Sequence, residues 1–165
     1  MATSYERALE IMAVTPRVLR AIVDGLPEEA LRRQPAPESW SPRDVLAHML
    51  RSESAGIGPR VRLMLAEEDP QLPPPEPVEV PEGTADVVDR WIAARAANLA
   101  LFRELTTAQR ERTGRHARFG RVTVREHLVE WAYHDLDHLR QLLAALQAEL
   151  YPDIPVFHAL YPSPV

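Results

Sequence analysis

Residues 123–150 read TVREHLVEWAYHDLDHLRQLLAALQAEL, a run without proline or glycine. Thr123 and Glu126 have the spacing of a capping box, which marks the first turn of many helices. Apolar residues then recur at every third or fourth position, the pattern of one buried helix face. The pattern stops at Pro152. The run therefore predicts one long helix.

Three segments before this run have the same periodicity. They predict helices over residues 4–24, 42–66 and 84–105, the first with a kink at Pro16. Ser41 as a cap, with proline directly after it, is typical of a helix start. Only residues 114–122 suggest an extended turn. Four long helices without clear strands predict an all-α protein with a four-helix bundle.

The prolines flank a long proline-free stretch, with twelve of the sixteen at or before Pro81 and four at or after Pro152. Residues 69–81 include three consecutive prolines and predict a semi-rigid, non-helical connection. Its length favours a long proline-rich crossover after the second helix.

The apolar tail after Pro152 could fold back on the bundle or on a partner subunit. With 165 residues, we expect a single domain over 1–165.

Composition excludes several classes of protein. The absence of cysteine excludes disulfides, thiolate zinc sites, iron–sulfur clusters and a cysteine nucleophile. All 19 basic residues are arginine, which excludes Schiff-base and P-loop chemistry and is typical of a GC-rich bacterial genome. A net charge of -5 argues against a nucleic-acid partner. Without a membrane-spanning segment or a signal peptide, we expect a cytoplasmic protein with no membrane partner.

His134 and His138 lie four residues apart on the apolar stripe of the last helix. At this spacing two imidazoles can bind one metal ion. The simpler interpretation is two independent polar residues at the edge of the core. A metal site needs a third ligand, and the other histidines are His48, His116, His127 and His158. His127 is about 16 Å from His138 by helical rise, so periodicity alone leaves the third ligand open.

Other metal-site patterns do not fit. A zincin helix needs glutamate directly after its first histidine, where this chain has Asp135. A ferritin-like di-iron bundle needs two Glu-x-x-His motifs, which are absent. The His134-Asp135 pair by itself is weak support for an HD-type phosphohydrolase.

Two segments together carry a family resemblance. Residues 38–48, ESWSPRDVLAH, and residues 130–142, EWAYHDLDHLRQL, resemble the DinB/YfiT-like family of bacterial proteins, and the resemblance covers essentially the whole chain. It implies a four-helix bundle that is frequently a homodimer. It also implies a divalent metal ion, zinc or nickel, held by His48, His134 and His138. The family name should not be read as DNA binding.

Some members of that family are thiol transferases, which add a low-molecular-weight thiol such as bacillithiol or mycothiol to electrophiles. The resemblance therefore implies a metal-dependent thiol S-transferase acting on a small-molecule substrate. Three imidazoles leave a fourth metal position for a thiolate, and a chain without cysteine needs a diffusible thiol. Glu130, one turn before His134, could be a base, a fourth ligand or a solvated helix residue.

Two other hypotheses remain open at this stage. The first is a non-catalytic stress-response or scaffold bundle, whose histidine cluster is structural or vestigial. The second is a small-molecule-binding module in which Trp40, Trp131 and Tyr133 line a pocket beside the histidines. Packing in the core is the simpler explanation for these aromatic residues.

Overall fold

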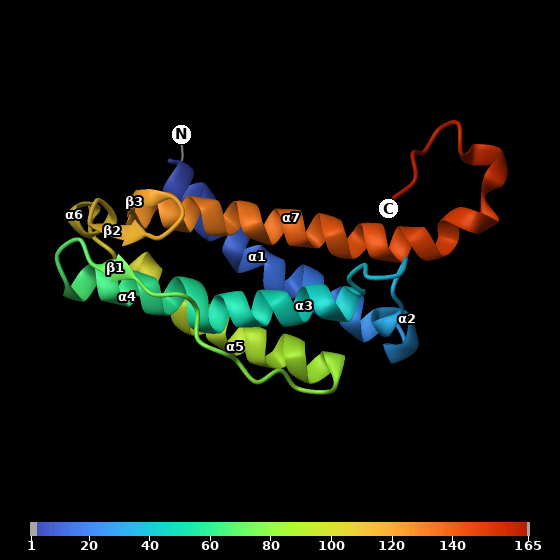
Figure 1. Ribbon diagram of the computed structural model, residues 1–165, viewed down its shortest axis with the longest axis horizontal. Coiled ribbons are helices and arrows are strands. Elements are labelled where there is room, and N and C mark those ends of the chain that lie inside the picture. The colour runs from blue at the N-terminus through green and yellow to red at the C-terminus, as the bar shows by residue number, and fades with distance from the viewer. Residues whose placement is uncertain (1–2, 165) are drawn as a thin grey trace.

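The computed structural model describes residues 3–164, and its four long helical segments form a bundle (Figure 1). The predicted all-α class and four-helix bundle are confirmed. The long segments are α1 (Ser4–Gly25), the continuous run of α3 (Pro42–Arg51), η1 (Ser52–Ile57) and α4 (Gly58–Ala66), then α5 (Thr84–Arg103) and α7 (Val124–Leu150). The short helices are α2 (Glu28–Arg32), α6 (Thr107–Arg110), η2 (Tyr151–Asp153) and η3 (Pro155–Phe157).

The helices begin where their capping residues predict. Capping boxes are complete at Thr3 with Glu6, at Ser41 with Asp44 and at Thr123 with Glu126. Each pair satisfies two backbone groups that the first turn of a helix leaves free. α1 stays helical across Pro16, and η1 is a π-helical turn within the second long segment.

The order of connections is not up-and-down. α1 packs against α5 and α7, and the segment beginning with α3 packs against the same two helices. α3–α4 and α5 run in the same direction, so the connection over residues 67–83 returns along the bundle (Figure 1). This is the predicted crossover. Proline makes such a stretch stiff, because its ring fixes one backbone angle.

A small sheet at one end of the bundle was not predicted in full. β2 (Thr113–His116) and β3 (Gly120–Thr123) form an antiparallel hairpin where an extended turn was expected. Gly120 has φ +73°, which favours glycine. β1 (Gln71–Leu72), from the proline-rich connection, pairs with β2 in parallel. Two residues are too few to show a strand's alternating pattern, so β1 could not be predicted from periodicity.

The core has an apolar cluster at each end of the bundle. One cluster, near the sheet, includes Tyr5, Met12, Ile57, Phe102 and Leu128. The other includes Leu19, Leu46, Leu50, Trp91 and Leu142. Between these clusters every long helical segment buries polar side chains: Thr15, Glu53, Arg95, Asp135 and His138. The bundle thus has a polar layer at mid-length, where the histidines lie.

The tail leaves the end of α7 and projects from the bundle (Figure 1). His158 stacks on Tyr151 with ring centroids 4.0 Å apart, while Val156 and Leu160 are 86% and 71% exposed. Within residues 3–164, no helix combines the length and the apolar character needed to cross a membrane.

Candidate metal centre

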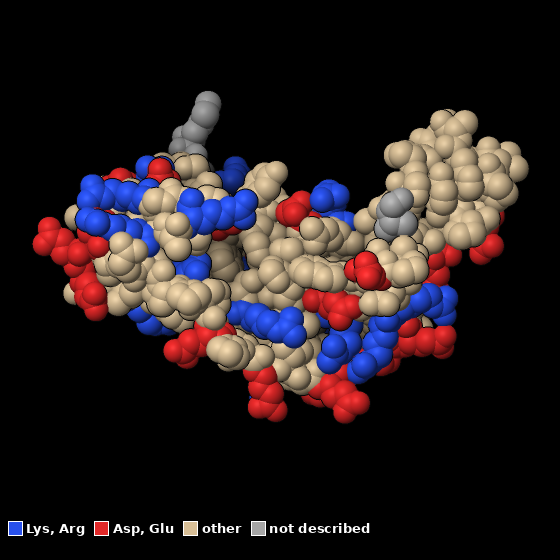
Figure 2. All heavy atoms as spheres, viewed as in Figure 1, with Lys and Arg blue, Asp and Glu red and all other residues tan. Residues whose placement is uncertain are grey.

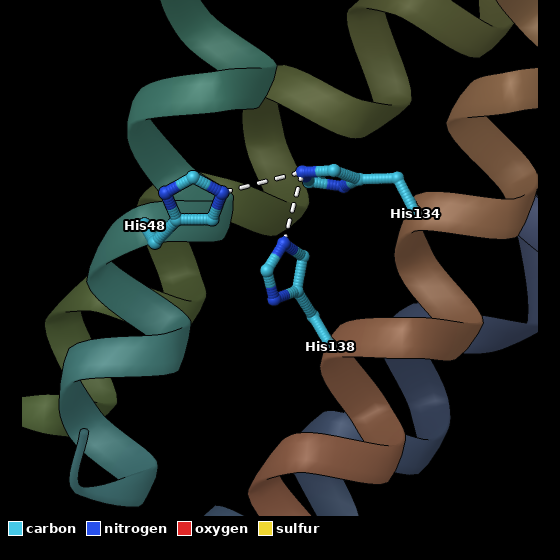
Figure 3. A group of neighbouring side chains, drawn as sticks. All are labelled: His48, His134 and His138. Atoms are coloured by element: carbon cyan, nitrogen blue, oxygen red, sulfur yellow. Dashed lines mark hydrogen bonds between the residues drawn. The ribbon is translucent and has the colours of Figure 1, made fainter. Parts of the chain in front are cut away.

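The structure brings His48, His134 and His138 together at mid-bundle (Figure 3). His48 lies on α3, and the other two lie one turn apart on α7. The Nε2 atom of His134 is 3.3 Å from Nε2 of His48 and 3.0 Å from Nε2 of His138. One ligand atom from each ring lies within 4.8 Å of the others. We call these residues the three-histidine cluster.

The spacing suits a shared cation. Ligands about 2.1 Å from a tetrahedral zinc ion lie about 3.4 Å from one another, close to the two separations above. Among the described residues, this cluster is the one group of histidine and acidic side chains with metal-binding geometry. The cluster could therefore hold a metal ion.

Neighbouring side chains set the proton positions on the rings. The Oε1 atom of Gln141 lies 2.9 Å from Nδ1 of His138 and accepts its proton. A proton on Nδ1 leaves a lone pair on Nε2, which is the form that binds a metal. The hydroxyl of Ser52 lies 3.4 Å from Nε2 of His48. Nδ1 of His134 is buried without a hydrogen-bond partner in the described part of the chain.

The surroundings favour neutral imidazoles. Burial is the main cause that lowers the pKa of His134 to about 3, with smaller contributions from the neighbouring His138, His48 and Arg95. Burial also lowers the pKa of His48, with contributions from His138 and Arg51. A neutral ring keeps its lone pair at physiological pH, so protons compete weakly with a metal at these two residues.

Two tryptophans flank the cluster. The ring of Trp131 stacks on His134, with centroids 4.9 Å apart and planes inclined by 19°. The ring of Trp40 lies 5.1 Å from His48 and 6.2 Å from His138. Trp40 also lines a surface cavity with Gln141 and Arg140. One hypothesis placed Tyr133 in the same pocket and the simpler explanation placed it in the core, but its side chain is 73% exposed. It comes directly before His134 and therefore lies on another face of α7.

A buried ion network lies behind the cluster. Arg95 of α5 donates Nη1 to Oδ2 of Asp135 at 2.5 Å and Nη2 to Oε2 of Glu53 at 2.8 Å. All three side chains are at most 1% exposed. Burial opposes the charge of Arg95, but hydrogen bonds and charges from Asp135 and Glu53 raise its pKa. Because Asp135 follows His134 directly, the network joins α5, η1 and the turn of α7 that carries His134.

The same network holds the tryptophan of α7. Trp131 donates Nε1 to Oε2 of Glu53 at 3.0 Å, and Asn98 donates Nδ2 to Oε1 at 2.7 Å. Glu53 lies in η1, and π-helical turns are frequent at functional sites. Pro16 also takes part, because a proline leaves the carbonyl four residues earlier without a helical donor. That carbonyl, of Met12, accepts Nη1 of Arg95 at 3.1 Å.

The remaining candidates lie outside the cluster. His127 is 8% exposed and borders a separate cavity with His116 and Glu130. Glu130 has an exposed side chain 4.0 Å from Nδ1 of His127, and it does not join the metal-binding group. His158 lies in the tail, where its Nε2 donates to the carbonyl of Tyr151 at 2.9 Å. The sequence pattern could have indicated Arg95, which occupies an apolar face of α5 between Trp91 and Leu99.

The fold and the cluster together define a class of protein: a four-helix bundle with a crossover and three imidazoles between its second and fourth long helices. The model of the DinB superfamily matches residues 12–142. The chain belongs to the DinB superfamily, as the resemblance implied.

Two solved structures are similar in fold. One is YfiT from Bacillus subtilis, which is described as a probable metal-dependent hydrolase with an unusual four-helix bundle topology. It aligns with a TM-score of 0.77 at 18% identity, and the alignment covers 87% of this chain and 86% of YfiT. TT2238, described as a four-helix bundle protein, aligns with a TM-score of 0.61 at 22% identity, covering 85% of this chain and 98% of TT2238. No curated protein matches the sequence.

Proposed function

We propose that this protein is a metal-dependent enzyme in which His48, His134 and His138 bind one divalent cation, zinc or nickel. The observation that supports it most is the convergence of three ring nitrogens within 4.8 Å. Imidazole is a good ligand for both metals. When bound, such an ion would lower the pKa of a water or thiol that takes a further position.

Thiol transfer is the reaction that we infer first. A low-molecular-weight thiol loses its proton to solvent water, its sulfur forms a bond to an electrophilic carbon, and the displaced group leaves with the bonding electron pair. The chain has no cysteine, so the sulfur comes from a diffusible molecule. The residues of the chain would orient the rings through Gln141 and shield them with Trp40 and Trp131.

Hydrolysis is the second candidate, with water in place of the thiol. It is favoured by the similarity to YfiT, which is described as a probable metal-dependent hydrolase. The same geometry serves both reactions, because a thiol and a water would compete for one position. A non-catalytic bundle with a structural histidine cluster is the alternative to both.

Metal analysis tests the site. Purified protein should contain about one equivalent of zinc or nickel, and His48→Ala should contain almost none. His158→Ala, which changes a histidine in the tail, is the matched control and should retain the metal. Adding zinc to metal-free protein should raise the melting temperature, because a ligand that binds only the folded state stabilises it. Absence of metal, and no change in melting temperature, would refute the site.

Activity assays separate the reactions. Metal-loaded protein is assayed with 1-chloro-2,4-dinitrobenzene and a panel of monothiols, and in parallel with 4-nitrophenyl acetate. A thiol transferase forms the aryl sulfide at a rate that His134→Ala lowers by at least a hundredfold. Metal-dependent release of nitrophenol without sulfide formation indicates the hydrolase instead. Metal binding with neither activity supports the non-catalytic bundle.

A further inference from the structure

A cavity of about 390 Å³ lies next to the three-histidine cluster, between the β2–β3 hairpin, α4 and α7. Its volume is within the range of small-molecule sites. Trp131 belongs to both places, because its ring stacks on His134 and also lines this cavity. In the space-filling view, the surface is hollowed beside arginines at the hairpin end (Figure 2).

The cavity is lined by the guanidinium of Arg60, which has one nitrogen free to donate. Arg60 donates Nε and Nη2 to the carbonyl of Pro73, at 3.3 Å and 3.1 Å. These bonds leave Nη1 for another acceptor. Within residues 3–164, no carboxylate forms an ion pair with Arg60. A guanidinium with a free donor is suited to binding a carboxylate.

Two imidazoles lie close to this guanidinium. Nδ1 of His116 accepts the backbone N–H groups of Arg118 and Phe119, at 3.1 Å and 3.4 Å, so its ring proton is on Nε2 and is free to donate. His127 is 8% exposed, and its Nε2 has no hydrogen-bond partner in the described chain. Burial lowers the pKa of both rings, and the positive charge of Arg60 lowers it further. An anion would relieve this repulsion.

In the described chain, the acidic residues of the wall form no hydrogen bond or ion pair with Arg60 or His116. Glu126 is held by the capping box of α7, where it accepts the backbone N–H and the hydroxyl of Thr123 at 2.8 Å and 2.7 Å. Glu130 is 59% exposed at the rim, with Oε2 4.0 Å from Nδ1 of His127, and its charge acts on Arg60 without a direct contact. Nη1 of Arg60 and Nε2 of His116 therefore remain available to donate in this cavity, while Phe119, Val122 and Trp131 provide apolar walls.

We propose that this cavity binds a small organic acid, with its carboxylate on Arg60 and His116 and its apolar body against Phe119 and Trp131. The binding itself does not depend on the metal. The inference that the acid is a substrate or product rests on the proposed function. Trp131 lies between the cavity and His134, so a bound acid would be next to a reactive group only if the three-histidine cluster holds a metal. The proposal is therefore tested on metal-free protein.

The experiment compares carboxylates with their neutral amides. Isovalerate, phenylacetate and indole-3-acetate, each beside its primary amide, are titrated into metal-free protein, and binding is followed by calorimetry and by the NMR signals of the hairpin. At least one acid should bind ten times more tightly than its amide. Arg60→Gln should remove that difference, and Arg60→Lys should restore part of it. Arg90→Gln is the matched control, since Arg90 also donates to a backbone carbonyl and is exposed.

The outcomes are distinct. Equal affinity for each acid and its amide, or no binding at millimolar concentration, overturns the proposal. A preference that persists in Arg60→Gln also overturns it. Melting temperatures of all variants show whether they fold. A protein that binds acids but no metal would keep this site and lose the proposed enzyme function, so the two failures can be told apart.

Discussion

Gln141 shows how one residue outside the cluster controls a ring within it. Its side-chain oxygen accepts the Nδ1 proton of His138 at 2.9 Å. Such outer partners fix the tautomer of a ligand, and their loss typically weakens metal binding 10- to 100-fold. We expect Gln141→Met to weaken zinc binding by about this factor, measured by competition with a chelating dye. Gln147→Met, at an exposed position of α7, should bind zinc like the wild type, and equal affinities in both variants would contradict this role.

Arg95 is the residue whose removal should damage the fold most. It is the only described positive charge bonded to the buried carboxylates of Glu53 and Asp135. Arg95→Met leaves both without a counter-charge, so we expect a loss of about 3–5 kcal/mol in the free energy of unfolding, measured in urea. Arg7→Ala removes an exposed pair with Glu10 and should change it by about 0.5 kcal/mol or less. A loss below about 1 kcal/mol for Arg95→Met would contradict the network's role.

The lowered pKa of His127 predicts that the folded protein loses stability in acid. Burial and nearby positive charge lower its pKa to about 4 in the folded protein, against about 6.5 when unfolded. Below about pH 6.5 the unfolded chain therefore binds a proton that the folded chain cannot, and stability falls as the pH drops toward 4. For this residue the loss is about 2–3 kcal/mol by pH 4.5. Urea unfolding of metal-free His127→Gln should show a smaller loss than His158→Gln, and parallel curves would contradict this.

The three histidines of the cluster could be predicted from the sequence, whereas the buried ion pairs around them could not. The spacing of His134 and His138 predicted a shared position, and the family resemblance, rather than periodicity, selected His48. Arg95 and Glu53 could not be paired in advance, because their contact depends on how α5 and η1 pack across the bundle. A charged residue on an apolar helix face indicates a buried partner but does not say which one.

The π-helical turn η1 is the element that connects the site to the core. It carries Glu53 inward and is followed by Gly58, where α4 begins. A Cβ atom at position 58 would lie 2.2 Å from Oδ1 of Asn98, the residue that also holds Glu53. The close approach of these helices therefore depends on glycine.

Gly58→Ala tests this packing. We expect it to lower the free energy of unfolding by about 1–3 kcal/mol, because Asn98 must move. Gly25→Ala is the matched control at the end of α1, where an added Cβ would have nothing within 4 Å. It should be neutral or slightly stabilising. Thermal unfolding of both proteins is the measurement. Equal melting temperatures would show that the Asn98 side chain can move without a loss of stability.

The helices were predictable and the irregular elements were not. Periodicity and capping residues gave starts at Ser4, Pro42 and Thr84 that agree with the structure. Pairing of β1 with β2 depends on two segments that meet only in the folded chain. The π turn is likewise invisible to a pattern of period 3.6, because it inserts its extra residue without changing the apolar composition.

For the whole molecule, the expected homodimer remains a prediction. Apolar side chains are exposed on one face of α7 and along the tail: Leu136, Leu143, Leu150, Val156 and Leu160. Figure 2 shows the projecting tail as a lobe with few charged side chains. Exposed apolar surface of this kind often marks an interface between proteins.

Light scattering after gel filtration measures the assembly. We expect a mass of twice 18.6 kDa for the wild type. The double variant Leu143→Gln, Leu160→Gln should shift the mass toward the monomer, since it adds polar groups to both apolar surfaces. Val14→Ser, at another exposed apolar position, should leave the mass unchanged. A monomeric wild type at 100 µM would contradict the prediction.

The distance along the chain between His48 and His134, 86 residues, has a consequence for biosynthesis. During translation His48 leaves the ribosome long before its two partners, and the crossover, α5 and the hairpin must all be made in between. The cluster can therefore close only when α7 has been synthesised and packed. A product that stops before residue 134 would retain His48 alone of the three rings, so metal loading in the cell should report on chains that extend through this part of α7.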